Sequence, residues 1–201
     1  MPRFAPFWWG QATKGFILSG GRFFGASKRS SVIWDISVCA EAAWHMDFRI
    51  AEVTLDEGSI VRWNPEIDRE RRVAIYDLLE SNHFAPASKL AGPYRLRLEI
   101  QENRLVFVIE SVCSPGATEE ILLPLSGFRR IIKDYFTVCE SYYDAIKRSP
   151  LGRIEALDMG RRSLHDEGSR LLLERLKGKI EIDFNTARRL FTLICVVQLR
   201  V

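Results

Sequence analysis

The alternation of apolar and charged side chains over residues 94–100 is the strongest constraint on how this chain folds. Apolar residues occupy every second position, with arginine or glutamate between them. A period of two is typical of a β-strand that has one face buried and the other in water. Residues 101–103 then predict a turn, and the apolar run at 105–112 predicts the returning arm of a hairpin. Residues 120–125 predict a third strand, which completes a small antiparallel meander.

The segment before this meander predicts one strand and one helix. Residues 48–55 are apolar enough for a strand. Asn64 followed by Pro65 is a favoured helix start, because asparagine caps free backbone N–H groups and proline has no N–H to satisfy. An apolar face at helical spacing follows, and we expect the helix to end at Asn82.

The segment after the meander begins with two predicted helices. Ser126 can cap the first, which has apolar residues on one face from Phe128 to Ile146. The second is expected to start at Pro150 and to run to about residue 177. Gly178 ends it, since glycine is the usual residue after the last helical turn.

The C-terminal part predicts a short strand at residues 179–183 and a last helix. Asp183 or Asn185 can cap this helix. Its end, residues 195–201, is rich in β-branched residues, so a strand there stays open. Strands first and helices afterwards indicate an α+β fold: an N-terminal strand and helix, a small antiparallel β-meander, and then three helices packed on the sheet.

Residues 1–45 differ in composition from the remainder of the chain. They hold four of the five tryptophans and show no sustained strand or helix period up to residue 29. We expect a basic N-terminal extension that is disordered, or translated sequence upstream of a true start at Met46. A basic arm that touches a membrane is the less favoured alternative. Residues 46–201 are expected to form a single α+β domain.

The charge of the chain is concentrated in this extension. Residues 1–45 hold five of the 29 basic and two of the 26 acidic residues, which leaves 24 of each for residues 46–201. A neutral domain is not expected to bind nucleic acid strongly. No apolar run approaches the roughly 18 residues that cross a bilayer, and no secretory signal is present. We therefore expect a cytoplasmic protein without a transmembrane segment.

No motif predicts a metal or a cofactor. Cys39, Cys113, Cys139 and Cys195 are scattered and form no C-x-x-C pair, so neither a zinc site nor a redox motif is indicated. The glycines at 20–25 lack the spacing of a dinucleotide-binding loop and follow no strand.

Five segments carry a resemblance to a known family. Together they resemble uncharacterised protein family 0262, an alphaproteobacterial family of unknown function, over about residues 46–201; the segments are 72–79 (RVAIYDLL), 92–96 (GPYRL), 128–143 (FRRIIKDYFTVCESYY), 154–169 (IEALDMGRRSLHDEGS) and 178–195 (GKIEIDFNTARRLFTLIC). The resemblance implies a cytoplasmic bacterial protein of one domain. It implies no activity, and residues 1–45 depart from the family pattern.

The predicted helix after Pro150 places charged residues on its apolar stripe. On a helical wheel Arg161 and His165 fall about 20° on either side of Ile154, and Asp158 lies about 40° from it. A charge on a buried face costs free energy unless it is paired. One interpretation is that Arg161 has a structural role and pairs with a carboxylate of the protein. The other is a polar pocket that binds an anionic ligand through Asp158, Arg161 and His165.

Glycines at helical spacing in the same segment predict close packing. Gly160 and Gly168 each cost the helix about 1 kcal/mol relative to alanine, so a gain elsewhere is expected. The favoured explanation is that the glycines allow another backbone to pack closely against this helix. The alternative is that they leave space for a ligand.

Two classes of function follow from these observations. The first is a small binding or adaptor module with an arginine-containing polar pocket, with a protein partner or a homo-oligomer as further options. The second is an enzyme that acts on a phosphorylated or otherwise anionic small molecule, using His165 and a carboxylate. Burial of Arg161 and His165 among protein partners favours the module or a structural role, and an open pocket favours the enzyme. No catalytic residue is assigned from the sequence.

Overall fold

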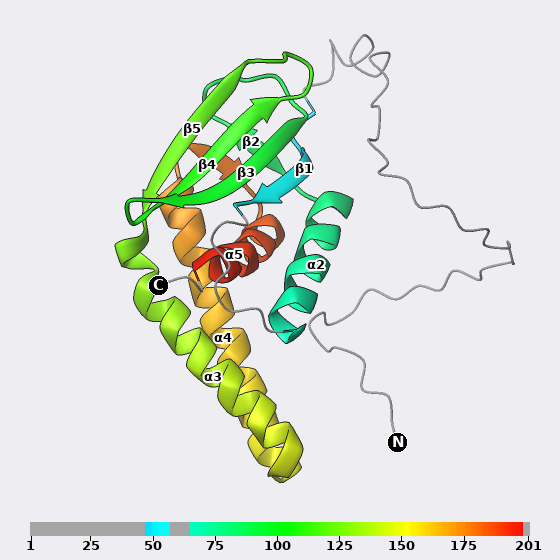
Figure 1. Cartoon of the computed structure of the whole chain (residues 1–201), viewed down its shortest axis with the longest axis vertical. Helices are drawn as coiled ribbons and strands as arrows, with labels where there is room; N and C mark the ends of the chain where they lie inside the picture. Colours follow the sequence, from blue (N-terminus) through cyan, green and yellow to red (C-terminus); the bar gives the residue numbers. More distant parts are fainter. Residues whose placement is uncertain (1–46, 57–64, 199–201) are drawn as a thin grey trace, which may run out of the picture. The chain divides into compact units, whose positions relative to one another are not determined.

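The computed structural model describes residues 47–56 and 65–198 (Figure 1). The elements follow in the order β1 (Ile50–Leu55), α2 (Pro65–Glu80), β2 (Phe84–Pro86), β3 (Tyr94–Gln101), β4 (Arg104–Ser111), β5 (Thr118–Pro124), the 3₁₀ turn η3 (Leu125–Gly127), α3 (Arg129–Arg148), α4 (Leu151–Leu176), β6 (Ile180–Ile182) and α5 (Phe184–Gln198). This is an α+β fold, as the order of strands and helices in the sequence predicts.

The main sheet has the strand order β1-β3-β4-β5. The predicted meander is confirmed, because β3, β4 and β5 pair antiparallel in sequence order. The β3–β4 turn consists of Glu102 and Asn103, which have φ angles of 45° and 68°. Two positive φ values in a two-residue loop match the right-handed twist of the flanking strands. The N-terminal strand β1 joins the same sheet by pairing parallel with β3.

The alternation in β3 separates a buried from a solvated face of this sheet. Tyr94, Leu96 and Leu98 are at most 1% exposed. Arg95, on the other face, forms ion pairs with Glu52 of β1 and Glu110 of β4. The period of two therefore predicts the burial of this strand correctly.

A second, two-stranded sheet pairs β2 with β6, and we call it the ribbon. The strand predicted at residues 179–183 is confirmed as β6, and its Ile182 lies opposite Phe84 of β2. The sequence pattern does not reveal β2, since three residues are too few to show a period.

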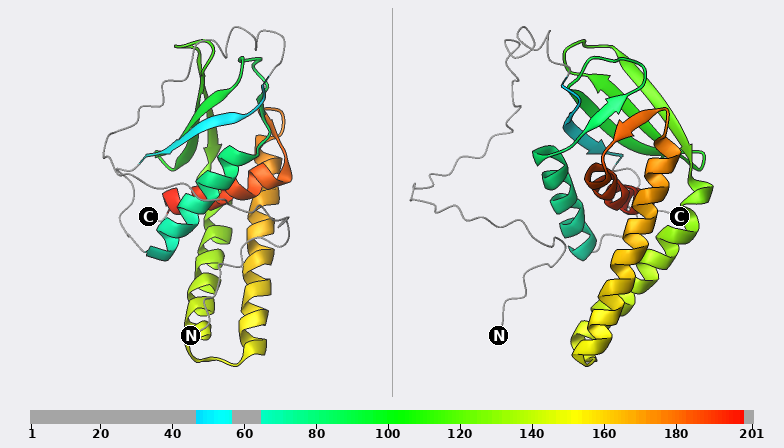
Figure 2. Two further views of the ribbon diagram at one scale, coloured as in Figure 1. Left: turned by 90° about the vertical axis from the view of Figure 1, so that its right-hand side faces the viewer. Right: turned by 180° about the vertical axis from the view of Figure 1, so that it is seen from behind.

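Helix α5 lies in the core and contacts α2, α4 and β3 (Figures 1 and 2). Asp183 is its cap, because its Oδ1 accepts a hydrogen bond from the Thr186 backbone N–H at 2.7 Å. The helix continues to Gln198, so the alternative of a strand from residue 195 is wrong for residues 195–198. Those residues are buried, and packing against neighbouring elements outweighs their β propensity. Residues 199–201 lie outside the described residues.

Helices α3 and α4 form an antiparallel hairpin (Figure 2). Ser126 is not the cap of α3: it lies in the preceding 3₁₀ turn, and α3 begins at Arg129 with no side-chain cap. Phe128, the residue before α3, is fully buried, so packing in the core fixes the start of this helix in place of a cap. The ends of α4 agree with the sequence, since Pro150 precedes it and Gly178, with a φ of 77°, follows it.

Several expectations concern residues outside the described part. The boundary near residue 45 and the state of residues 1–45 stay predictions, as does the start of α2 at Asn64. Of the cysteines, Cys139 and Cys195 are free thiols, and Cys39 lies outside the described residues. Among residues 47–56 and 65–198, no helix combines the length and the apolar character that crossing a membrane requires.

Candidate functional site

Arg161 is buried within the helical layer, at 3% exposure, as its place on the apolar stripe predicts. Its Nη2 lies 2.5 Å from Oδ1 of Asp158, one turn earlier on α4. Its guanidinium carbon lies 5.0 Å from the centre of the Tyr142 ring on α3, in cation–π geometry. Burial alone lowers the pKa of Arg161, but the hydrogen bond to Asp158 leaves this pKa raised. Arg161 is therefore a charged residue held by protein groups.

Asp158 binds two arginines at once. Its Oδ2 lies 2.6 Å from Nη2 of Arg162, which is 46% exposed. The helical wheel distinguishes these two arginines correctly, since one points into the helical layer and the other toward solvent.

His165 is buried between the aromatic rings of Tyr135 and Phe191, whose centres lie 5.6 and 5.4 Å from its own. Its Nε2 is 2.9 Å from Oγ1 of Thr192 on α5. The Thr192 hydroxyl also lies 3.3 Å from the Arg188 carbonyl, one turn earlier on α5. The hydrogen bond between His165 and Thr192 ties α4 to α5.

The charge state of His165 follows from its surroundings. Burial, and then the positive charges of Arg188 and Arg161, lower its pKa from 6.5 to about 3. The imidazole is therefore neutral throughout the physiological pH range. A general base usually has its pKa close to the working pH, whereas burial and the neighbouring positive charges lower the pKa of His165.

Tyr143 and Glu70, which the sequence analysis did not single out, belong to the same polar cluster, because the charge of Arg161 acts on the Tyr143 hydroxyl. The hydroxyl of Tyr143 on α3 donates a hydrogen bond of 2.7 Å to Oε1 of Glu70 on α2. Cys139 on α3 has its pKa raised to about 12, first by burial and then by the charge of Glu70. Glu70 shows no spacing relation to α3 or α4 in the sequence, because contacts between distant helices leave no local pattern.

The three predicted site residues do not converge on one point. Asp158 contacts Arg161, whereas His165 makes its hydrogen bond to the other side, with α5. In the described part of the chain, no group of three His, Cys, Asp or Glu side chains is arranged to hold a metal ion. The arrangement is suited to joining α3, α4 and α5.

Gly168 allows α5 to approach α4. A Cβ at this position would lie 2.1 Å from the Phe191 ring, far inside van der Waals contact. The predicted close packing is present, but it is made with an aromatic side chain and not with another backbone. Gly160 differs, because a Cβ there would lie 3.9 Å from Val138 and meet only ordinary contact.

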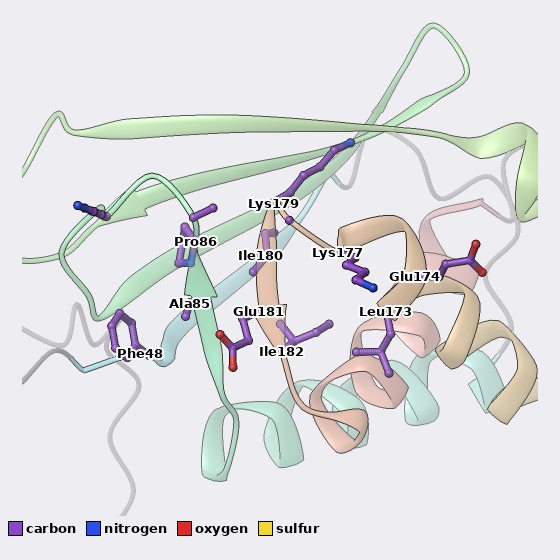
Figure 3. A pocket seen from close by; sticks show the side chains of 13 residues that line it. Phe48, Ala85, Pro86, Leu173, Glu174, Lys177, Lys179, Ile180, Glu181 and Ile182 are labelled. Atoms are coloured by element: carbon purple, nitrogen blue, oxygen red, sulfur yellow. The ribbon is translucent and has the colours of Figure 1, made fainter.

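A groove with a volume of about 630 Å³ lies beside the ribbon (Figure 3). Leu173 and Lys177 at the end of α4 lie on one side of it, and Phe48 lies on the other, with β6 between them. Its apolar lining comes mainly from Phe48, Pro86, Leu173, Ile180 and Ile182. Its charged lining consists of Lys89, Lys177, Lys179, Glu174 and Glu181. We call this hollow the ribbon groove.

The second hollow, of about 250 Å³, lies on the solvated face of the main sheet. Its charged residues already pair with one another, as Arg95 does with Glu52 and Glu110. Neither hollow is lined by Asp158, Arg161 or His165.

These features define a class of protein: an α+β domain with a meander sheet, in which the helices α2, α3, α4 and α5 supply a buried polar cluster. The chain belongs to the uncharacterised protein family UPF0262, whose model matches residues 47–200. The resemblance seen in the sequence is thereby confirmed.

Relatives in this family come from several bacteria. A UPF0262 protein of Rhizobium etli is 53% identical over 154 residues, which are 77% of this chain and 97% of its own length. One from Sphingopyxis alaskensis is 52% identical over 156 residues, 76% of this chain and 94% of its own. One from Bradyrhizobium is 58% identical over 152 residues, 75% and 89% respectively. No solved structure shows significant similarity to the chain.

Proposed function

We propose that this domain is a small binding module that takes an anionic ligand with an apolar portion into the ribbon groove. The observation that carries the proposal is the lining of the groove. Its walls are mainly apolar, and three lysines outnumber two glutamates around them. Ligand sites are concave and mostly apolar, with a few polar groups that orient the ligand.

The position of two lysines supports an anionic group at one end of the ligand. Lys177 and Lys179 flank Gly178, in the turn between α4 and β6. The Nζ of Lys179 also lies 3.4 Å from the Leu122 carbonyl on β5. A phosphate or carboxylate at this end would meet the ammonium group of Lys177, and Lys179, whose side chain extends toward β5, adds positive charge nearby (Figure 3).

A binding module is favoured over an enzyme because the titratable groups of the helical layer are enclosed. Arg161 and His165 are each 3% exposed and hydrogen-bond to protein groups. Their burial and their hydrogen bonds to protein groups support a structural role for Arg161 and His165. Binding of an anion by Asp158, Arg161 and His165 stays a prediction, which the same experiment tests. A cytoplasmic location belongs to this proposal. Weak or absent nucleic-acid binding also belongs to it, on the ground of the neutral charge of residues 46–201.

A thermal-shift screen of the full chain tests the proposal. The probes are phosphorylated metabolites and aryl or alkyl carboxylates, with divalent metal ions alone as a separate arm. A ligand present at about 100 times its dissociation constant stabilises the folded state by about 2.7 kcal/mol. The expected rise in melting temperature is about 5–10 °C for a chain of this size.

Charge-reversal variants locate the site. Lys177→Glu is expected to abolish the shift, whereas Lys133→Glu, at an exposed lysine of α3 outside the groove, leaves it unchanged. If Arg161→Ala removes the shift and Lys177→Glu does not, the anion binds at the buried cluster. If no anionic probe raises the melting temperature, the proposal is wrong.

A further inference from the structure

Strand β6 of the ribbon directs part of its backbone away from its partner β2. The Ala87 N–H donates a hydrogen bond of 2.8 Å to the Lys179 carbonyl, which continues the β2–β6 register by one pair. Bonded and non-bonded pairs alternate along an antiparallel ladder, so the next bonded pair on β6 is at Glu181. The N–H and C=O groups of Ile180 and Ile182 therefore point away from β2.

The two edges of the ribbon differ in how these outward groups are paired. At the β2 edge, the Phe84 N–H donates a hydrogen bond of 2.8 Å to the Phe48 carbonyl. At the β6 edge, no backbone hydrogen bond joins Ile180 or Ile182 to another element in the described part of the chain. Both residues line the ribbon groove, although they are only 4% and 8% exposed. Because enclosed backbone groups are almost always paired, this edge suits a ligand that brings backbone donors and acceptors of its own.

The closed end of the groove sets the direction of such a ligand. Lys177, Gly178 and Lys179 join the end of α4 to the start of β6, so a chain lying along β6 has to end there (Figure 3). A chain parallel to β6 would place its N-terminal ammonium group beside Lys177. An antiparallel chain places its C-terminal carboxylate there, and attraction between opposite charges favours this direction.

We propose that the ligand of the ribbon groove is the C-terminal end of a peptide, which adds to β6 as an antiparallel third strand of the ribbon. This inference rests on the binding function proposed above and names its ligand class. Addition of a strand to a sheet edge is a general mode of peptide recognition. The last residue of the peptide lies opposite Ile180 and the third-last opposite Ile182, and each exchanges two backbone hydrogen bonds with its partner.

The side chains along the groove set the sequence that such a peptide prefers. Residues directly opposite each other in antiparallel strands interact on the same face. The last and third-last side chains are therefore expected to be apolar, since they lie beside Ile180 and Ile182 in a groove that Leu173 also lines. The second-last side chain is expected to be basic. It lies opposite Glu181, which is exposed and forms no ion pair within the described part of the chain.

Calorimetric titration of the full chain with two hexapeptides tests the carboxylate. Both peptides end in Val-Lys-Val, one with a free C-terminal carboxylate and the other with a C-terminal amide. The free acid is expected to bind at least about tenfold more tightly, because only the acid carries the charge that pairs with Lys177. Lys177→Glu is expected to remove this difference, whereas the control Lys133→Glu leaves it unchanged.

Methylation of single peptide nitrogens tests the pairing with β6. N-methylation of the third-last residue removes the donor to the Ile182 carbonyl and is expected to weaken binding about tenfold. The matched control is N-methylation of the second-last residue, whose N–H points away from β6, and it is expected to change the affinity by less than about threefold. Glu181→Lys is expected to change the preferred second-last residue from lysine to glutamate. Equal effects of the two methylations overturn the pairing.

The outcomes distinguish this inference from the proposed function. The inference is overturned, and the function stands, if small carboxylates raise the melting temperature but the free acid does not bind at about 1 mM. The inference is also overturned if the amide binds as tightly as the acid. If neither the small anions nor the peptide bind, both proposals are wrong.

Discussion

At the scale of single residues, Arg161 and Arg162 show how one position along a helix changes the task of a side chain. Both bind Asp158, yet only Arg161 is enclosed and stacked on Tyr142. Removing one residue of a buried ion pair is costly, because the other residue is left as a buried charge without an opposite charge beside it. An exposed pair contributes little, because water solvates both charges.

We predict that Arg161→Ala lowers the free energy of unfolding by about 2–4 kcal/mol. The variant loses a buried hydrogen bond and the contact with Tyr142, and it leaves a cavity. Arg162→Ala, the matched control, is expected to cost no more than about 1 kcal/mol. Urea unfolding of the two variants measures the difference. Small and equal losses would contradict the structural task of Arg161.

At the scale of elements, the packing of α5 across α4 depends on one missing side chain. Phe191 of α5 occupies the space where residue 168 would carry a Cβ. The intrinsic cost of a glycine in a helix is offset here by contact between two helices. Gly160, which faces Val138 at ordinary distance, has no such gain.

The two glycines are therefore expected to respond to alanine with opposite signs. Gly168→Ala is predicted to destabilise the protein by about 1–3 kcal/mol, because Phe191 must move out of a packed core. Gly160→Ala is predicted to stabilise it by up to about 1 kcal/mol through helix propensity alone. Thermal or urea unfolding gives both values. Stabilisation by both substitutions would show that Phe191 repacks without loss.

At the scale of the whole molecule, the question is which part of the chain forms the stable unit. The family model begins at residue 47, next to Met46. The described sheet and helices contribute their core residues from Ile50 onward. That residues 46–201 form a domain that folds without the N-terminal extension stays a prediction.

We predict that a chain beginning at Met46 melts within about 2 °C of the full chain, because it retains every core residue of the described part. Differential scanning calorimetry on both proteins checks this. A melting temperature lower by several degrees in the shorter chain would show that the first 45 residues stabilise the domain.

Local patterns alone determined most elements of this protein, with β2 as the exception. The period of two located β3, proline and glycine located the ends of α4, and a helical wheel placed Arg161 inside and Arg162 outside. These features depend on residues close in the chain, whose geometry is set by backbone stereochemistry and side-chain polarity.

Only the tertiary structure decided how these elements meet. The pairing of β2 with β6, the partners Thr192 and Glu70 in the polar cluster, and the ribbon groove all join residues far apart in the sequence. The exposure of Ile146 has the same origin, since the apolar period of α3 continues past the helices that cover it. A periodic pattern states which side of a helix is apolar, but burial depends on whether another element reaches that side.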